Sequence, residues 1–410
     1  MNAPDAEVLH RRMVEALVAA GTLTDDWRPA FDAVPRHAFV PNITWRHGAA
    51  NGKWGFIPRH RVEDPDGWLS AAYQDDSVIT QVDDGDPAGP DGTGVLPTSS
   101  ISMPTVVAAM LRALDVHDGQ KVLEIGTGTG YNAALLAHRL GAQHVTTVEI
   151  DPAVARAARH GLDQTGYRGI TVVTADGAQG MAVHAPYDRV LSTASCQQVP
   201  YPWVAQTVPG GMVLTPWRNA YHPGGLLSLI VGADGTAAGR IVDCAWFMQL
   251  RDQRVPRCTV ADVVCGDYQG EESTTSIGPY ELAGHRGAML AISLQVPHCR
   301  HQYFPYDPQD GTGELWFLDP WSGSWASHVH TTPDCSDDEF SVRQRGPRRL
   351  WDEIFAAHTW WTEQGRPDEQ HWTFTVHPAG QSIDLTPRNA IAAGLVSSDR
   401  GAVDRLGRGK

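Results

Sequence analysis

The chain has 410 residues, a formal net charge of −15 and 42% hydrophobic residues. This length exceeds that of one ordinary domain, so we expect two domains. The acidic charge and the lack of a basic stripe argue against nucleic acid as the main partner, because phosphate binding requires a basic face.

The N-terminal region predicts helices within residues 6–41, followed by a long irregular stretch. Apolar residues recur at helical spacing from Ala6 to about Ala20, and a second short helix is expected to end near Val34. Residues 42–80 give no regular pattern. Residues 81–97 are rich in Gly, Pro and Asp, which predicts a loop that is either a lid beside a site or a plain insertion.

The most informative segment is VLEIGTGTGY at residues 122–131, which is followed by a helix and by a second apolar strand that ends at Glu149. A strand, a glycine turn, a helix and an acidic strand end predict the first β–α–β unit of a nucleotide-type site. The glycines follow a G-x-G-x-G pattern with Glu124 two positions before it. This form is typical of sites for S-adenosylmethionine, which carries a cationic sulfonium and no pyrophosphate. A dinucleotide site and a glycine turn without a ligand remain as alternatives.

Further alternating elements complete the predicted core. A helix is expected over residues 153–164, a strand over 170–173 that leads to Asp176, and strands near 187–193 and 208–214. This alternation predicts an α/β, Rossmann-like fold with a doubly wound, mostly parallel sheet over about residues 98–235. Ligands would bind at the carboxyl ends of its strands.

The pattern changes after about residue 223. Strand-like runs follow at residues 226–231, 239–249, 288–294 and 314–318, a helix is expected over 348–363, and two last strands over 372–376 and 382–385. We therefore predict a C-terminal α+β domain. The expected domains are residues 1–256 and 257–410, and the second is a candidate for recognising a peptide substrate.

Several segments together resemble protein-L-isoaspartate O-methyltransferases. VPRHAFVP at residues 34–41 resembles a turn of that family, and Ser100–Pro104 resembles its T-I-S-x-P substrate loop. The glycine segment at residues 122–131 and Pro209–Gly211 also match family motifs. The resemblance covers roughly residues 6–255.

The resemblance implies a cofactor site for S-adenosylmethionine, with S-adenosylhomocysteine as product and no metal. In it, Glu149 would hold the ribose hydroxyls and Asp176 the adenine amine. The residues implied in cofactor binding are Glu124, Gly126, Thr127, Gly128, Gly130, Asn132, Glu149, Ile150, Asp176 and Gly177.

The resemblance also implies a substrate site for a carboxylate, formed by Ser99, Ser100, Ile101, Ser102 and Thr193. Ser102 is the candidate catalytic residue, and its alternative role is to cap the following helix. A carboxylate is already ionised at neutral pH, so methylating it requires no general base. The work is to position the substrate oxygen behind the methyl group and to exclude water.

The remaining composition excludes several other classes. Two histidine pairs, in residues 298–301 and 328–330, have no matching partners at zinc spacing. No uninterrupted apolar segment reaches membrane-spanning length, and the polar N-terminus does not resemble a signal peptide. The six scattered cysteines, without a C-x-x-C pair, indicate reduced thiols and a cytoplasmic protein. Nothing in the sequence indicates an oligomeric state.

Three departures from the family pattern affect the predicted substrate. Ser100 replaces the family's Thr, Phe247–Arg251 replaces its V-P-L run, and residues 257–410 are absent from the housekeeping repair enzyme. With the acidic residues 81–94 and Arg349–Glu353, the chain resembles the subgroup that methylates L-aspartate in ribosomally made peptides, such as lanthipeptides, so that it cyclises to aspartimide. The alternatives are isoaspartate repair of damaged proteins, a non-enzymatic sensor of S-adenosylmethionine, and an NAD-type oxidoreductase.

Overall fold

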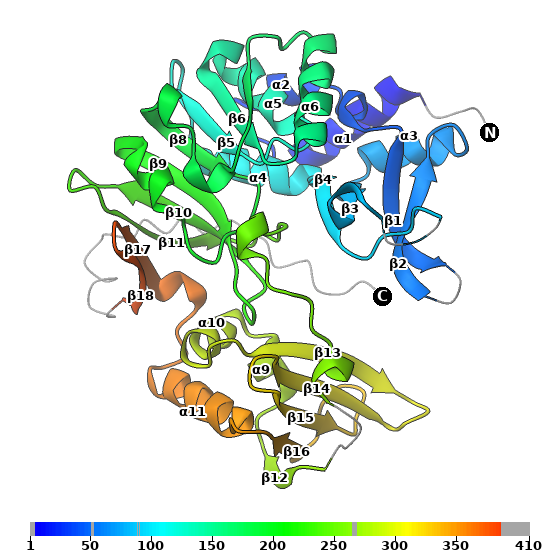
Figure 1. Cartoon of the computed structure of the whole chain (residues 1–410), viewed down its shortest axis with the longest axis vertical. Helices are drawn as coiled ribbons and strands as arrows, with labels where there is room; N and C mark the ends of the chain where they lie inside the picture. The colour runs from blue at the N-terminus through cyan, green and yellow to red at the C-terminus, as the bar shows by residue number, and fades with distance from the viewer. Residues whose placement is uncertain (1–4, 51–52, 88, 90, 265–268, 387–410) are drawn as a thin grey trace.

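The computed structural model describes residues 5–50, 53–87, 89, 91–264 and 269–386 (Figure 1). A nine-stranded sheet forms its centre, in the order β18-β17-β11-β10-β9-β8-β5-β6-β7. The strands are β5 (Val122–Ile125), β6 (Val145–Glu149), β7 (Thr171–Thr174), β8 (Tyr187–Ser192), β9 (Thr207–Trp217), β10 (Gly225–Val231), β11 (Ala237–Asp243), β17 (Trp372–His377) and β18 (Gly380–Leu385). The five strands from β9 to β7 are parallel, and the pairings from β9 to β18 are antiparallel. This arrangement confirms the predicted Rossmann-like α/β fold.

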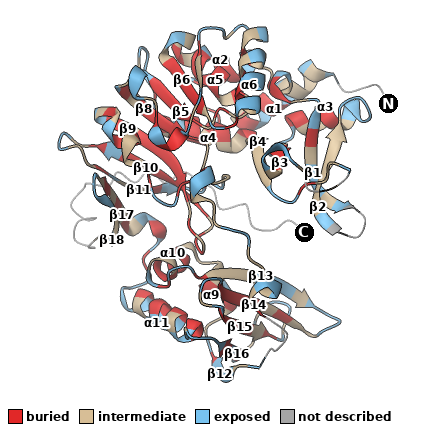
Figure 2. Cartoon of the chain, viewed as in Figure 1, coloured by how far each residue is buried: buried red, intermediate tan, exposed pale blue. Residues whose placement is uncertain are grey.

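Helices cover both faces of this sheet. They are α1 (Ala6–Ala19), α2 (Arg28–Ala33), α4 (Pro104–Leu114), α5 (Tyr131–Leu140), α6 (Pro152–Gln164) and α7 (Tyr201–Ala205). Because successive strand residues point to opposite faces, Val122 and Leu226 join one hydrophobic core while Leu123 and Leu227 join another. The first core also holds residues of α1, α2, α4, α5 and α6, and the second holds residues of α7. Figure 2 shows the buried residues concentrated along these strands.

A second sheet, of four antiparallel strands, carries the predicted substrate loop. Its order is β2-β1-β3-β4. The strands are β1 (Ile43–Ala50), β2 (Lys53–His60), β3 (Val78–Val82) and β4 (Pro97–Ile101), and α3 (Pro65–Tyr73) lies between β2 and β3 in the chain. Residues 42–80, which gave no pattern in the sequence, therefore contain a hairpin and a helix. β4 leads directly into Ser102 and then into α4, so this sheet positions the loop.

The part of the chain after residue 256, which we call the extension, contains a unit around a third sheet, with the order β12-β16-β15-β14-β13. Its elements are α8 (Val260–Val263), β12 (Glu271–Thr275), α9 (Pro279–Ala283), α10 (Arg286–Gln295), β13 (Arg300–Asp307), β14 (Thr312–Asp319), β15 (Ser324–His330), β16 (Phe340–Arg345) and α11 (Leu350–Glu363). Residues 288–294, predicted as a strand, instead belong to α10, so that prediction was wrong. A short apolar run does not distinguish a buried strand from a buried helix, and residues 287–292 are buried on every side.

The last two strands return to the first sheet. β17 pairs with β11 through Ala237–Gly239, and β18 pairs with β17, at the left edge of the sheet in Figure 1. Residues of α10 and α11 also join the second hydrophobic core, with Trp361 fully buried there. The domain boundary at residues 256/257 stays a prediction, but two strands from beyond it belong to the central sheet. Within the described ranges, every helix is too short or too polar to cross a bilayer.

Short 3-10 helices connect these elements. They are η1 (Arg36–Phe39), η2 (Asp83–Gly85), η3 (Ala142–His144), η4 (Gly177–Gln179), η5 (Ala182–His184), η6 (Arg251–Gln253) and η7 (Glu369–His371).

Candidate active site

A large cleft lies at the carboxyl ends of the parallel strands, where this fold places ligands. Its volume is about 1860 Å³, and a recess of about 40 Å³ shares part of its lining. The predicted residues that line the cleft are Ser99, Ser100, Ser102, Gly126, Gly128, Glu149, Ile150, Asp176, Gly177 and Thr193. Ile101, Thr127 and Asn132 line the recess. The fold thus brings together segments that lie more than 70 residues apart in the sequence.

The glycine turn between β5 and α5 requires glycine at two positions that face the cleft. Gly126 has a φ of +91°, and a Cβ atom there would lie 2.7 Å from Thr193 Oγ1. Gly128 has a φ of +54°, and its N–H donates to Glu149 Oε2 at 2.9 Å. Gly130 also has a positive φ, but it packs against Leu162 and does not line the cleft or the recess. The turn therefore needs glycine for its positive φ angles and, at Gly126, for the close approach of Thr193.

Glu149, at the end of β6, presents a partly buried carboxylate to the cleft. Its Oε1 accepts the Asp151 N–H at 3.1 Å, and its Oε2 accepts the Gly128 N–H, so each oxygen keeps capacity for a ligand hydroxyl. Burial raises the pKa of this carboxyl group, although the two backbone donors oppose the shift. Ile150, with 39% of its surface exposed, adds an apolar surface beside the carboxylate.

Asp176 and Gly177 lie at the neighbouring strand end, after β7. Asp176 Oδ1 accepts the Ala178 N–H at 2.9 Å, which leaves Oδ2 for a ligand amine. The indole N–H of Trp203 donates to the Gly177 carbonyl at 2.8 Å and fixes this turn. Glu149, Ile150 and Asp176 therefore form one end of the cleft, which we call the cofactor end.

Glu124 behaves differently from the sequence expectation. It is fully buried and lines neither the cleft nor the recess, because its carboxylate accepts hydrogen bonds from Asn132 Nδ2 and Thr147 Oγ1, both at 2.6 Å. Burial raises the pKa of Glu124 to about 7. The Thr147 hydroxyl also contacts Thr127 Oγ1 at 2.7 Å. Glu124 thus sets the orientation of Asn132, which does line the recess.

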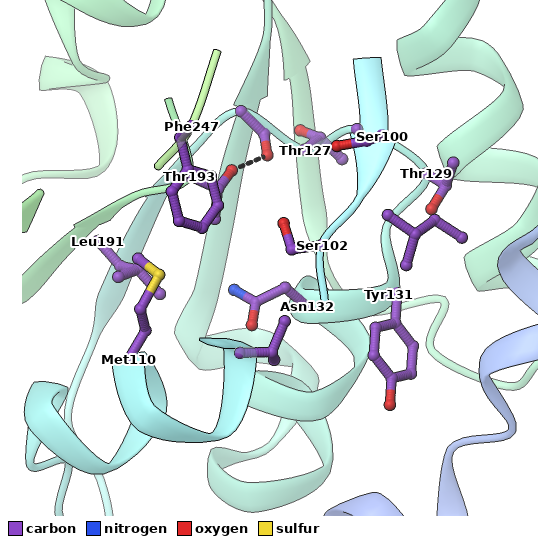
Figure 3. Close-up of a pocket in the computed structure, with 14 residues that line it drawn as sticks. Ser100, Ser102, Met110, Thr127, Thr129, Tyr131, Asn132, Leu191, Thr193 and Phe247 are labelled. Carbon is purple, nitrogen blue, oxygen red and sulfur yellow. Dashed lines mark hydrogen bonds between the residues drawn. The ribbon is translucent and has the colours of Figure 1, made fainter. Parts of the chain in front are cut away.

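Ser102 points into the recess, together with Asn132, Thr193 and Phe247 (Figure 3). Its Oγ makes no hydrogen bond to any other described residue, so it is free to donate to a ligand. The alternative role as a helix cap receives no support, because α4 begins at Pro104 with Met103 at the cap position. Asp75 instead accepts the Thr105 N–H at 2.9 Å.

Thr193 lines the recess, but its hydrogen-bond donors are already used. Its N–H donates to the Ile125 carbonyl at 2.8 Å, and its hydroxyl lies 2.6 Å from the Gly126 carbonyl (Figure 3). The Ala194 N–H lies 3.2 Å from Ser192 Oγ. The resemblance placed Thr193 in the substrate site, where nearby backbone N–H groups could hold a substrate oxygen. In this structure those groups hold the glycine turn and its flank instead. Ser102 and Ser100 also line the recess, and the hydroxyl of each makes no hydrogen bond to another described residue.

The comparisons with known proteins agree with this geometry. A model of the protein-L-isoaspartate(D-aspartate) O-methyltransferase family matches residues 66–249. A protein-L-isoaspartate O-methyltransferase of Aeropyrum pernix is 37% identical over 205 residues, or 49% of this chain and 63% of that protein. Protein-L-isoaspartate O-methyltransferase 2 of a Polaromonas species is 36% identical over 200 residues, which cover 86% of that protein and 49% of this chain. The chain belongs to this family.

A solved structure of a protein-L-isoaspartate O-methyltransferase aligns with a TM-score of 0.52 and 18% identity, over 92% of this chain and 100% of the other. At that identity the match supports the fold alone. Its coverage reaches beyond the residues that the family model matches and into the extension. Membership in the family, predicted from the motifs, is confirmed, whereas membership in the peptide-modifying subgroup stays a prediction.

Sequence reasoning about the family motifs missed the role of Arg36. This side chain is fully buried behind the substrate loop and donates to the carbonyls of Ser102 at 3.0 Å and Ile101 at 3.3 Å. It also donates to the carbonyls of Ala72 at 2.6 Å and Asp76 at 2.9 Å. The motif VPRHAFVP contained the signal, but only the fold shows that this guanidinium holds the Ser102 segment.

A set of ion pairs fastens Asp84, in the segment between β3 and β4, beside the cofactor end. Arg254 donates to both Asp84 oxygens, at 2.6 and 2.9 Å, and Arg251 lies 3.1 Å from the same carboxylate. Gln81 Nε2 donates to Asp151 Oδ2 at 3.0 Å. We call Asp84, Arg251 and Arg254 the clasp. It joins the loop before β4 to the segment that replaces the family's V-P-L run.

The histidine pairs do not form a metal site in the part of the chain that the structure describes. No group of three or more His, Cys, Asp or Glu side chains there is arranged to hold a metal ion. His328 instead contacts the Ile277 carbonyl at 2.9 Å, and His301 contacts the Tyr221 carbonyl at 3.1 Å.

Proposed function

We propose that this protein transfers a methyl group from S-adenosylmethionine to the carboxylate of an aspartyl residue in a polypeptide. The observation that carries the proposal is the free Ser102 hydroxyl in a recess that opens beside the glycine turn. The cofactor fits the residues present, because the cleft beside the glycine turn is lined by Glu149 and Asp176, whose carboxylates keep acceptor capacity for the ribose hydroxyls and the adenine amine. S-adenosylmethionine, when bound, supplies a methyl group activated by its cationic sulfur.

The chain's own residues would bind the cofactor through three contacts. The Glu149 oxygens would accept the ribose hydroxyls, and Asp176 Oδ2 would accept the adenine amine. The backbone of Gly126–Gly128 would lie along the methionine part, with Asn132 beside it. Glu124, held away from the cleft, would act through Asn132 as a positioning residue and add a buried carboxylate near the cationic centre.

The chemistry then requires positioning rather than proton transfer. The substrate carboxylate is ionised at neutral pH, and no histidine occurs among the described residues that line the cleft or the recess. Ser102 Oγ would donate a hydrogen bond to one carboxylate oxygen and so orient the other toward the methyl group. Phe247 and Met110, which line the recess, would exclude water from the reacting atoms.

For the substrate, we propose L-aspartate in a ribosomally made peptide. The backbone nitrogen of the next residue then attacks the methyl ester, and aspartimide forms as methanol leaves. The supporting observation is that the extension forms part of the cleft, through Tyr280 and Arg286. A polypeptide bound there would contact a part of the chain that the family model does not match. Arg349–Glu353 gives this proposal no support from geometry, because Arg349 pairs with Glu271 inside the extension and does not line the cleft.

Repair of isoaspartyl residues is the second candidate, and the names of the relatives favour it. The two substrates differ in which carboxylate extends from the main chain, and both would present an ionised oxygen to Ser102. A cytoplasmic location stays a prediction, and its support is the scattered pattern of the cysteines.

The deciding experiment compares substrates that differ in one linkage. Two synthetic peptides of identical sequence, one with L-aspartate and one with isoaspartate, are incubated with the enzyme and S-adenosylmethionine, alongside any precursor peptide encoded next to the gene. A methyl ester on the L-aspartyl peptide, or a net loss of water from that peptide once the ester has cyclised and released methanol, supports the peptide-modifying function. A much higher kcat/KM on the isoaspartyl peptide supports repair. Binding of S-adenosylmethionine without transfer to any peptide would contradict both.

A further inference from the structure

The cleft continues beyond the recess, between the central sheet and the extension. One unbroken segment, residues 243–251, lines it along its length, and Tyr280 and Arg286 line it from the extension. The segment begins where β11 ends, and it includes the five residues that replace the family's V-P-L run. The departure noted in the sequence therefore lies along the wall of the cleft.

Successive residues of this segment contact different parts of the cleft, from the cofactor end to the extension. Arg251 lies at the cofactor end, 3.7 Å from Asp151. Phe247 lines the recess with Ser102. Trp246 lies against Gly224, whose carbonyl accepts a hydrogen bond from Arg286 of the extension. A residue bound in the recess would thus have the cofactor on one side and Trp246 on the other.

Two aromatic side chains are unusually exposed on this far side. Trp246 has 71% and Tyr280 has 68% of its surface exposed, and both line the cleft. We call the part of the cleft beside them the aromatic arm. Large exposed aromatic side chains in a concave site are typical of residues that contribute much of a binding energy.

The position of Tyr280 is set by the packing of α9. Leu282 is fully buried, and the Tyr221 hydroxyl donates to its carbonyl at 2.9 Å, which ties α9 to the loop before β10. A Cβ atom at Gly284 would lie 2.3 Å from the Tyr280 ring, so a glycine there makes room for the ring. The ring therefore stays beside the cleft without occupying the recess.

The charges in the aromatic arm largely compensate one another. Arg286 is paired with the buried Glu369, at 2.7 Å. The lining of the whole cleft also includes Arg112, Asp76 and Asp243. With no clear excess of one sign, apolar contact is the main interaction that the arm offers.

We propose that the aromatic arm binds the residues that flank the methylated residue in the substrate polypeptide, and that it favours an aromatic or aliphatic side chain there. This inference rests on the proposed function, because it takes the recess as the place of the reacting carboxylate. When one residue of a polypeptide lies in the recess, the rest of that polypeptide must extend out of it. The cofactor would occupy the cofactor end of the cleft, so the polypeptide would extend away from that end. The arm belongs to the same cleft as the recess, and it offers two large exposed aromatic side chains to a polypeptide that extends from the recess.

The test uses the full-length protein and two substrate lengths. A blocked four-residue peptide and a twelve-residue peptide share the same central residue, prepared as L-aspartate and as isoaspartate, and the longer one carries aromatic residues on both sides. Trp246→Ala and Tyr280→Ala are compared with Trp321→Ala. Trp321 lies in the extension, is 75% exposed and does not line the cleft, so it is a matched control.

We expect the KM for the long peptide to rise about tenfold in Trp246→Ala and Tyr280→Ala, the loss typical of one important aromatic contact. The KM for the short peptide should change far less, and Trp321→Ala should match the wild type. An unchanged KM for the long peptide, or an equal rise for both lengths, would overturn the inference. Failure of the proposed function would look different, because the wild type would then methylate neither peptide.

Discussion

Arg36 offers the sharpest test of how the fold prepares the reaction. Its guanidinium holds four backbone carbonyls, from Ala72, Asp76, Ile101 and Ser102. Hydrogen bonds from a charged group contribute about 1.5–3 kcal/mol each, but the cost of burying the charge offsets much of their sum. Removing the guanidinium leaves these carbonyls without their donor, at about 1–3 kcal/mol for each one that stays buried, or about 3–5 kcal/mol in all once the cost of burying the charge is recovered. We expect a loss in that range for Arg36→Met and a smaller one, about 1–2 kcal/mol, for Arg36→Lys, which keeps the charge and three donors.

The functional consequence separates positioning from mere stability. In Arg36→Lys the Ser102 carbonyl loses part of its anchor, so Ser102 Oγ should occupy its position only part of the time. We expect kcat to fall at least tenfold, while the Kd for S-adenosylmethionine stays unchanged because Glu149 and Asp176 are untouched. Unfolding in denaturant measures stability, and kcat is measured at saturating concentrations on the folded variant. A variant that is destabilised but keeps the wild-type kcat would refute this reasoning.

The other predictions concern single contacts at the site. Ser102→Ala should lower kcat by about tenfold to a hundredfold, which corresponds to the loss of one hydrogen bond to a charged group. The Kd for S-adenosylmethionine should stay unchanged. A kcat equal to that of the wild type would exclude Ser102 from the site. Because burial raises the pKa of Glu124 to about 7, this group is protonated below that pH and ionised above it. Affinity for the cationic cofactor, measured by calorimetry, should therefore fall as pH drops through about 7, and Glu124→Gln should flatten this dependence; a profile unchanged by the substitution would exclude Glu124 as its source. Asp84→Asn breaks the clasp and should speed the dissociation of S-adenosylmethionine several-fold in stopped-flow measurements. Asp32→Asn, in an exposed pair with Arg28, serves as the control. Identical dissociation rates in the two variants would show that the clasp does not limit release of the cofactor.

The sequence predicted the core of the fold because its signals there are local. The apolar run before Gly126, the positive φ that glycine permits and the acidic end of β6 all lie within one short stretch of chain. Strands buried on both faces read as continuous apolar runs, and the alternation with helices fixes their parallel direction. The predicted substrate loop rests on the resemblance of Ser100–Pro104 to a family motif, which is also a local signal.

The features that sequence could not predict depend on contacts between distant residues. Whether Glu124 faces a ligand or the interior depends on Asn132 and Thr147, which supply its hydrogen bonds. The donors of Thr193 are used by the carbonyls of Ile125 and Gly126, and no pattern near residue 193 shows this. The strand predicted at residues 288–294 failed because burial on all sides removes the periodicity that separates helix from strand.

The return of β17 and β18 to the central sheet has a consequence for engineering the molecule. A chain cut after residue 256 would lose both strands, and β11 would become an open edge ready to pair with another molecule. Such a truncation would also remove Phe374, which packs against Trp217 at a ring separation of 5.1 Å. In topology, the unit from α8 to α11 is therefore an insertion between two neighbouring strands. To swap or remove it cleanly, one would replace that insertion with a short linker and keep residues 372–385 as part of the catalytic scaffold.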